Sequence, residues 1–301
     1  MRLPVAALLI ATACSSSSPA PKSPPEQAGR VQRFQIGNLE AYALADGHLV
    51  VPNDGKLLGF GRSPSEIADV LAAAGLPRDD IRLDIQCLLV KAADRVILFD
   101  AGTGDPSFPM TGQLPQSLAL AGVAPGAITD IFISHAHSDH VGGLITKAGA
   151  LAFPTATIHM SAPEWAAFQA NTDDDSRRYI AAIAPKVAAF EPGAQVLPVV
   201  KAVATPGHTP GHSSYEIGTG ADKVVYLGDV AHHSVISVQR PAWSLQVDAD
   251  RPAAEVLRQA TLAKLAADRV RVFAVHFPFA GVGHVVAEGQ GFVWKPEAIV
   301  R

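Results

Sequence analysis

Apolar residues follow two different patterns along this chain, and each pattern predicts a different kind of element. Short runs rich in Val, Ile and Leu, such as Phe34 to Leu44 and Ile85 to Asp100, predict strands. Ser63 to Glu66 forms a capping box ahead of a helix that Gly75 closes, and Ala253 to Ala267 predicts a longer helix. Strands that alternate with helices favour a layered α/β architecture. The apolar residues that repeat at helical spacing in the longer helix are Val256, Leu257, Ala260 and Leu265.

The first 29 residues differ from the rest of the chain. One Arg precedes a short apolar run and small residues follow, which is typical of an export signal and is too short to span a bilayer. Ala11 to Ala13 is an A-x-A cleavage pattern, and because Cys14 follows, the stretch also resembles the lipobox of bacterial lipoproteins. We expect a signal at residues 1–13 and, from the polar, Pro-rich composition, a flexible tether at residues 14–29.

This interpretation places a single folded domain at residues 30–301 and predicts an exported protein, either periplasmic or anchored to a bacterial membrane through an acylated Cys14. Cleavage by an ordinary signal peptidase is the alternative to acylation. The only other cysteine, Cys87, lies in an apolar run, so we expect a small buried core residue and no disulfide. The formal net charge of -4 gives no reason to expect a nucleic-acid partner, and a small-molecule substrate fits better.

Four potential metal ligands lie within six residues, directly after an apolar strand-like run. His135, His137, Asp139 and His140 occupy these positions in the segment HAHSDH. Zinc-type ions take imidazole nitrogens and carboxylate oxygens as ligands at about 2.0–2.2 Å, and a loop at a strand end is where such side chains can converge. The spacing lets the side chains face two ways, which suits two adjacent ions rather than one.

Three further candidates follow in order along the chain: His208 in TPGHTPGH, Asp229 in YLGD and His276 in VHFP. Each comes after an apolar strand-like run. A single His is more often a hydrogen-bonded surface or core residue than a ligand, so these residues count as candidates because the HAHSDH cluster accompanies them.

The ordered set resembles the motifs of the metallo-β-lactamase superfamily, over essentially the whole chain from Phe34 onward. The resemblance implies a four-layered αββα sandwich that binds two divalent metal ions, with zinc expected and manganese, cobalt or iron compatible with the same ligands. The roles it implies are His135, His137 and His208 on the first ion, Asp139, His140 and His276 on the second, and Asp229 bridging both. Asp100, in LFDAG, matches the first motif of the family, where the carboxylate orients a ligand instead of binding metal.

Two segments resemble a narrower branch, that of the methyl parathion hydrolases and lactonases: GDVAHH at Gly228–His233 and HFPFAGVGH at His276–His284. That branch cleaves lactones, aryl esters and aryl phosphotriesters. The likeness therefore implies a hydrolase whose nucleophile is a hydroxide that bridges two metal ions. Asp229 then acts in catalysis as the bridging ligand, and Asp139 is the best candidate for moving a proton to the leaving group.

Competing interpretations remain within and outside the hydrolases. A β-lactamase-type amide hydrolase is the nearest alternative, and an Asp at position 229 argues against it. A mononuclear iron persulfide dioxygenase is the alternative from another class, and the complete set of ligands for a second ion argues against that. A nuclease would need a basic track, which the chain lacks, and a non-catalytic binding protein would be expected to have lost ligands.

Residues near the motifs complete the list of candidates. Four histidines outside the ligand positions are expected to form structural or pocket-lining hydrogen bonds: His212, His232, His233 and His284. Seven apolar side chains are candidates for the wall of the substrate pocket, with core packing as the alternative for each: Leu57, Leu58, Phe60, Trp165, Phe168, Trp243 and Phe277.

Overall fold

The fold is taken from a computed structural model, which describes residues 29–104, 110–289 and 291–298. The expected signal segment, Cys14 and nearly all of the expected tether lie outside the described residues. Among the helices that the structure describes, none has the length and apolar character needed to cross a bilayer.

The first half of the chain forms one seven-stranded sheet, in which the strands lie side by side in the order of the sequence. The first four strands are joined antiparallel, and β4 to β7 run parallel to one another. The strands are β1 (Val31–Ile36), β2 (Leu39–Pro52), β3 (Asp80–Ala92), β4 (Arg95–Phe99), β5 (Asp130–Phe132), β6 (Thr157–Ser161) and β7 (Val187–Phe190).

The second half forms another seven-stranded sheet, again in sequence order. Its strands are antiparallel except for β11 and β12, which run parallel. The strands are β8 (Gln195–Leu197), β9 (Val200–Ala204), β10 (Ser213–Ile217), β11 (Val224–Tyr226), β12 (Arg271–Phe273), β13 (Val282–Glu288) and β14 (Gly291–Pro296).

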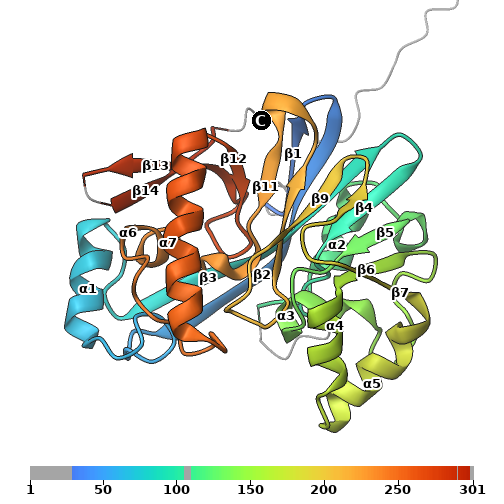
Figure 1. The fold of residues 1–301 in the computed structure, drawn as a ribbon, viewed down its shortest axis with the longest axis horizontal. Coiled ribbons are helices and arrows are strands. Elements are labelled where there is room, and N and C mark those ends of the chain that lie inside the picture. Colours follow the sequence, from blue (N-terminus) through green and yellow to red (C-terminus); the bar gives the residue numbers. More distant parts are fainter. Residues whose placement is uncertain (1–28, 105–109, 290, 299–301) are drawn as a thin grey trace, which may run out of the picture.

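The two sheets pack face to face over an apolar core to which both contribute. Phe99 of β4 lies 5.5 Å from Tyr226 of β11, measured between ring centroids, and Tyr226 stacks on Phe273 of β12 at 5.5 Å. Helices cover the outer faces: α2, α4 and α5 lie beside the first sheet, and α7 lies on the second (Figure 1). This arrangement is the four-layered αββα sandwich that the resemblance implied.

The helices begin where the sequence carries capping residues. Ser63 caps α1 and forms the predicted capping box with Glu66, and Asp250 caps α7, where its side chain accepts from the Ala253 amide at 3.1 Å. The helices are α1 (Pro64–Ala73), α2 (Leu114–Leu120), α3 (Ser138–Val141), α4 (Ala162–Gln169), α5 (Asp174–Ile183), α6 (Ile236–Gln239) and α7 (Arg251–Asp268).

The buried face of α7 differs from the one that its apolar spacing suggested. Val256 is 68% exposed, whereas the charged Arg258 is buried together with Leu262 and Leu265. Arg258 can occupy a core position because each of its three nitrogens donates at least one hydrogen bond, including that of Nε to the Val230 carbonyl at 2.8 Å.

Candidate metal centre

The candidate ligands lie in loops that follow strand ends at one edge of the sandwich. The cluster from His135 to His140 follows β5, and Asp100 directly follows β4, which is parallel to β5. In the second sheet, His208 follows β9, Asp229 follows β11 and His276 follows β12. These three strands run in the same direction, so their ends meet at one edge. The fold thus brings together seven residues that are up to 141 positions apart in the sequence.

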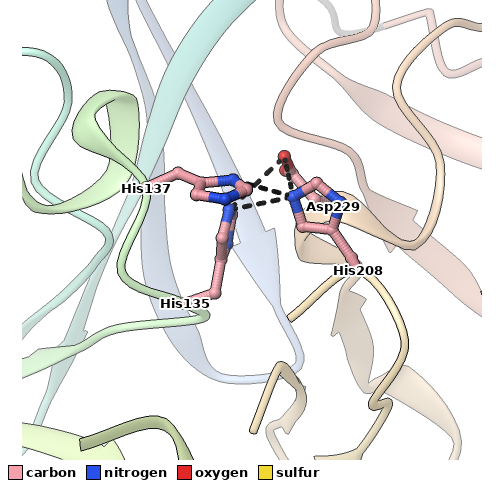
Figure 2. A group of neighbouring side chains, drawn as sticks. All are labelled: His135, His137, His208 and Asp229. Atoms are coloured by element: carbon pink, nitrogen blue, oxygen red, sulfur yellow. Dashed lines mark hydrogen bonds and ion pairs between the residues drawn. The ribbon is translucent and has the colours of Figure 1, made fainter. Parts of the chain in front are cut away.

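The first group consists of His135, His137, His208 and Asp229, whose side chains point toward one another from loops of both halves of the chain (Figure 2). His208 Nε2 lies 3.2 Å from His135 Nε2 and 3.0 Å from His137 Nδ1. Asp229 Oδ2 lies 3.4 Å from His208 Nε2 and 3.6 Å from His135 Nε2. Four ligands held tetrahedrally at about 2.0–2.1 Å from one zinc ion are about 3.3 Å apart, so this group fits one such ion.

The second group consists of Asp139, His140 and His276, and it meets the first at Asp229. Asp139 Oδ2 lies 3.5 Å from the Nε2 atoms of both histidines. The other oxygen of Asp229, Oδ1, lies 3.3 Å from His140 Nε2 and 3.2 Å from His276 Nε2. Both His140 Nε2 and Asp229 Oδ1 are buried and form no hydrogen bond with any described residue, which is costly unless a cation completes their environment. The residues present therefore fit a divalent metal ion at this group as well.

Most ligand histidines are oriented by an acceptor on the ring nitrogen that faces away from the group. His140 Nδ1 lies 2.7 Å from Asp100 Oδ2, as the resemblance implied for Asp100. His276 Nδ1 lies 2.9 Å from the Asp84 carbonyl oxygen, and His208 Nδ1 lies 2.8 Å from Asp248 Oδ1. Such acceptors fix the ring and its tautomer and are a general feature of histidines that bind metal.

Asp100 is itself held in a strained conformation. Its φ of 56° is in the left-handed region that non-glycine residues rarely adopt, which costs of order 1–3 kcal/mol. The carboxylate accepts from the Ser134 amide at 2.7 Å and from the Tyr226 hydroxyl at 2.7 Å, so three elements besides its own loop fix its position. This strain supports the role of Asp100 in orienting His140.

Two residues that support the first group are absent from the sequence-based list, Arg258 and Glu164. Arg258, 1% exposed, donates to Asp248 Oδ2 at 2.8 Å and thereby holds the acceptor of His208. Glu164 of α4, 2% exposed, accepts from the Ala136 amide at 2.8 Å and from the Gly211 amide at 2.9 Å. Glu164 therefore links the HAHSDH loop to the loop that carries His208.

A backbone hydrogen bond fixes the loop of Asp229. The Asp229 amide donates to His212 Nε2 at 2.9 Å, while Thr205 Oγ1 lies 2.8 Å from His212 Nδ1. Gly228 has a φ of +58°, and a Cβ at this position would lie 2.6 Å from the His212 ring. A glycine is therefore required before Asp229, and His212 has the structural hydrogen bonds that we expected for it.

The two groups differ in their protonation when no cation is bound. Burial lowers the pKa of His137 to about 4, which leaves this ring neutral at neutral pH and ready to bind metal. Burial also opposes the charged form of His140, but the nearby carboxylates of Asp229 and Asp139 outweigh it and raise the pKa of His140. Metal binding at the second group therefore has to displace a proton.

A cavity of about 260 Å³ opens onto both groups. Besides the potential ligands, its wall includes Ser138, His232 and four apolar side chains: Leu49, Leu57, Leu83 and Val247. Of the expected wall residues only Leu57 lies here. Phe277 is a core residue against Trp294, and Leu58 and Phe168 are also buried in the core, because each faces a helix or a sheet instead of the loops. The other three also lie away from the cavity: Phe60 contacts Arg251, Trp243 contacts Arg62, and Trp165 packs against the core beside the first sheet.

The remaining candidates have separate roles. Cys87 is 1% exposed in the core beside the first sheet, as predicted, and burial raises the pKa of its thiol. His233 Nδ1 accepts from two backbone amides of its own loop, and His284 lies on β13, outside the cavity. His232 lines the cavity, as expected, but it forms no side-chain hydrogen bond.

Comparisons with known proteins agree with this geometry. A family profile described as "Metallo-beta-lactamase superfamily" matches residues 80–276. Among solved structures, AidC, a dizinc quorum-quenching lactonase with a bound product, is 30% identical with a TM-score of 0.86, over 90% of this chain and 99% of that one. The hydrolase AbOPH, of the beta lactamase superfamily, is 26% identical with a TM-score of 0.81, over 91% and 99%. The uncharacterized protein YobT of Bacillus subtilis is 29% identical over 139 residues, which span 44% of this chain and 56% of that protein.

Proposed function

The chain belongs to the metallo-beta-lactamase superfamily, and from that premise we propose that it is a lactonase that works with two divalent metal ions. The observation that carries the proposal is the Asp229 carboxylate, since each of its oxygens faces a different group of potential ligands. A carboxylate shared in this way is what two adjacent cations need, because it offsets charge from both.

The lactone as substrate is supported by two further observations. AidC, which shares 30% of its sequence with this chain, is a lactonase. Four of the six side chains that line the cavity besides the ligands are apolar, so the wall favours an uncharged, hydrocarbon-bearing substrate over a charged one. Aryl esters and phosphotriesters present the same kind of oxygen leaving group and are therefore included in the test.

Divalent ions at such sites lower the pKa of water and polarise the oxygen of an acyl or phosphoryl group. The contribution of the protein is to hold the geometry. Asp100, Asp248 and the Asp84 carbonyl keep three imidazole rings in one orientation each, so no reorganisation is needed during the reaction. Leu49, Leu83 and their apolar neighbours reduce the water content of the cavity around the substrate.

Asp139 is placed to exchange a proton with the leaving oxygen. Both Asp139 and Asp229 line the cavity, but the side chain of Asp139 is 20% exposed and that of Asp229 only 4%. Burial disfavours ionisation of Asp139, but His140 and His276 outweigh this and hold its pKa below the usual range. The carboxylate is thus ionised, so it can accept a proton from the attacking water and then pass that proton to the leaving oxygen.

The test is a substrate panel on purified protein of known metal content. Zinc-loaded enzyme is assayed with N-hexanoyl-homoserine lactone, an aryl acetate, an aryl phosphotriester and a β-lactam in one buffer, with chelator-treated enzyme as the blank. We expect about two zinc ions per chain and fastest cleavage of the lactone. One iron per chain, or activity that survives complete metal removal, would contradict the proposal.

Replacement of Asp229 by Ala tests the shared carboxylate directly. We expect loss or weakening of one of the two metal ions and a fall in kcat/KM of at least about a hundredfold, because the charge between the two cations is removed. Asp94→Ala, an exposed carboxylate in the turn after β3, serves as the matched control and should change neither quantity. A variant that retains two ions and a near-normal rate would refute the assignment of Asp229.

A further inference from the structure

His232 is a buried imidazole whose contacts differ from those of the other histidines near the centre. It is 5% exposed, and neither Nδ1 nor Nε2 forms a hydrogen bond with any described residue. Leaving a buried polar atom unsatisfied costs about 1–3 kcal/mol, so such an atom needs an explanation. The other histidines near the centre that lie outside the ligand positions, His212 and His233, have their hydrogen bonds within the protein.

The ring of His232 is part of the wall of the cavity that opens onto the metal centre. It stacks on His276 with ring centroids 5.4 Å apart and an interplanar angle of 11°, and it lies edge-on to His208 at 4.8 Å. Its Nε2 atom is 3.0 Å from Asp229 Oδ2, in an orientation that forms no hydrogen bond. His232 therefore stands between the two ligand groups, next to the carboxylate that they share.

His232 forms a potential ligand group with Asp229 and His276, but one feature of its surroundings differs from those of three other ligand histidines. His140, His208 and His276 each have an acceptor on the ring nitrogen that faces away from the group, whereas Nδ1 of His232 has none. A histidine that binds metal almost always donates its second N–H to such an acceptor. The missing acceptor favours a role toward whatever enters the cavity, and the zinc content of His232 variants separates this role from metal binding.

The loop fixes the ring in place without using its nitrogens. The amides of His232 and His233 both donate to Ser237 Oγ at 3.2 Å, and Val230 is held by Arg258 through its carbonyl. The ring is also confined between His208 and His276. A donor held in this way loses little freedom when it forms a hydrogen bond with a ligand, which is the condition for effective stabilisation of a developing charge.

We propose that His232 is a further catalytic residue, whose imidazole N–H donates a hydrogen bond to an oxygen atom of the substrate bound beside Asp229. The proposal rests on the hydrolase function proposed above. In a lactone, the oxygen that gains negative charge during attack is the carbonyl oxygen, and the ring oxygen gains it as the bond to the acyl carbon breaks. A fixed N–H donor beside the reacting group stabilises either one more strongly than it stabilises the ground state.

Two substitutions separate hydrogen bonding from shape. His232→Leu removes both ring nitrogens and retains an apolar side chain, whereas His232→Gln retains an N–H donor at a similar distance from the backbone. His284→Gln, on β13 outside the cavity, is the control for loss of a histidine. For each protein the zinc content, the melting temperature, kcat and KM for the lactone and the aryl acetate, and the calorimetric affinity for N-hexanoyl-homoserine are measured.

We expect all four proteins to retain the same zinc content. His232→Leu should lower kcat/KM by about a hundredfold, mainly through kcat, and His232→Gln should recover at least about tenfold of that loss. The affinity for the product, which carries the same oxygens, should fall by about tenfold in His232→Leu. The control His284→Gln should match the wild type in each of these quantities.

Three results would overturn the proposal. If His232→Leu loses zinc in proportion to activity, His232 is a metal ligand. If kcat/KM and the product affinity are unchanged, His232 takes no part in the reaction. If the Leu and Gln variants have equal defects, His232 has a packing role. A wild-type enzyme that cleaves the aryl acetate but not the lactone would contradict the lactonase proposal without deciding the role of His232. In that case the same comparison on the aryl acetate decides the role of His232, and the product titration decides it if neither substrate is cleaved.

Discussion

Replacement of Arg258 by Met should destabilise the protein more than any other single change on α7. The guanidinium is 1% exposed and donates four hydrogen bonds, to Asp248 and to the carbonyls of Val230, Pro241 and Trp243, at 2.8–3.2 Å. Methionine fills most of the same space but offers no donor. The change therefore removes the donor to three carbonyl oxygens and leaves the buried Asp248 carboxylate with only the His208 ring as a partner among the described residues.

The magnitude follows from the charge that is left behind. Removing one partner of a buried ion pair costs about 3–5 kcal/mol, because the remaining charge has lost its compensation. A domain of ordinary stability has about 5–15 kcal/mol in total, so the loss is a large fraction of it. Asp248 also orients His208 through a 2.8 Å contact, and we expect the zinc affinity of the first group to fall by about tenfold.

Urea denaturation of zinc-loaded and zinc-free protein measures both effects. Zinc-free Arg258→Met should lose about 3–5 kcal/mol in free energy of unfolding, and the zinc-loaded protein should lose more, since zinc then stabilises it less. Lys264→Met, at an exposed position of the same helix, should cost less than about 0.5 kcal/mol. A loss below about 1 kcal/mol for Arg258→Met would refute the view that this buried guanidinium holds Asp248 in place.

Three further predictions concern pH, localisation and substrate choice. Burial raises the pKa of Asp130, but His159, Thr129 and Arg95 outweigh it and lower the pKa from 3.8 to about 2, so Asp130→Asn should cost about 1–2 kcal/mol at pH 7. Because the folded-state pKa is the lower one, denaturation curves of the two proteins should converge as the pH falls from about 5 to 2, and a constant difference would contradict this. We propose that the protein is an exported lipoprotein, so it should fractionate with membranes and Cys14→Ser should release it or block its processing, whereas soluble export of both forms would favour ordinary secretion. Lactone, ester or phosphotriester cleavage should exceed β-lactam cleavage by at least about a hundredfold in kcat/KM, about 2.7 kcal/mol, and comparable rates would overturn the lactonase assignment.

The ligands could be predicted from the sequence because their positions are local to strand ends. HAHSDH, and the later His208, Asp229 and His276, each follow an apolar run, and the end of such a run is fixed by the pattern itself. The structure brings all of them together. The capping residues Ser63 and Asp250 were predictable for the same reason, since a cap acts on amides three residues away.

The residues that support the ligands could not be predicted in this way. Arg258 reads as a polar position on a helix, and only its burial beside Asp248 shows that its charge has a partner inside the protein. Glu164 has the sequence position of an ordinary acidic residue in the first turn of α4, and the amides that donate to it lie on two loops that are distant in sequence. The apolar wall of the cavity could not be predicted for a related reason. Leu49 and Leu83 belong to long strands, and the apolar pattern does not indicate which strand residues face a cavity and which face the core.

The order of strands in the two sheets has a consequence for synthesis of the chain. Each sheet is built from one continuous half of the sequence, so β1 to β7 can pair before β8 has left the ribosome. Until the second half arrives, the inner face of this sheet, which includes Phe99 and Phe132, has no cover and is open to aggregation or to chaperones. The nascent first half also carries the HAHSDH ligands without the three residues that complete their coordination. We therefore expect metal incorporation to follow the docking of the two halves.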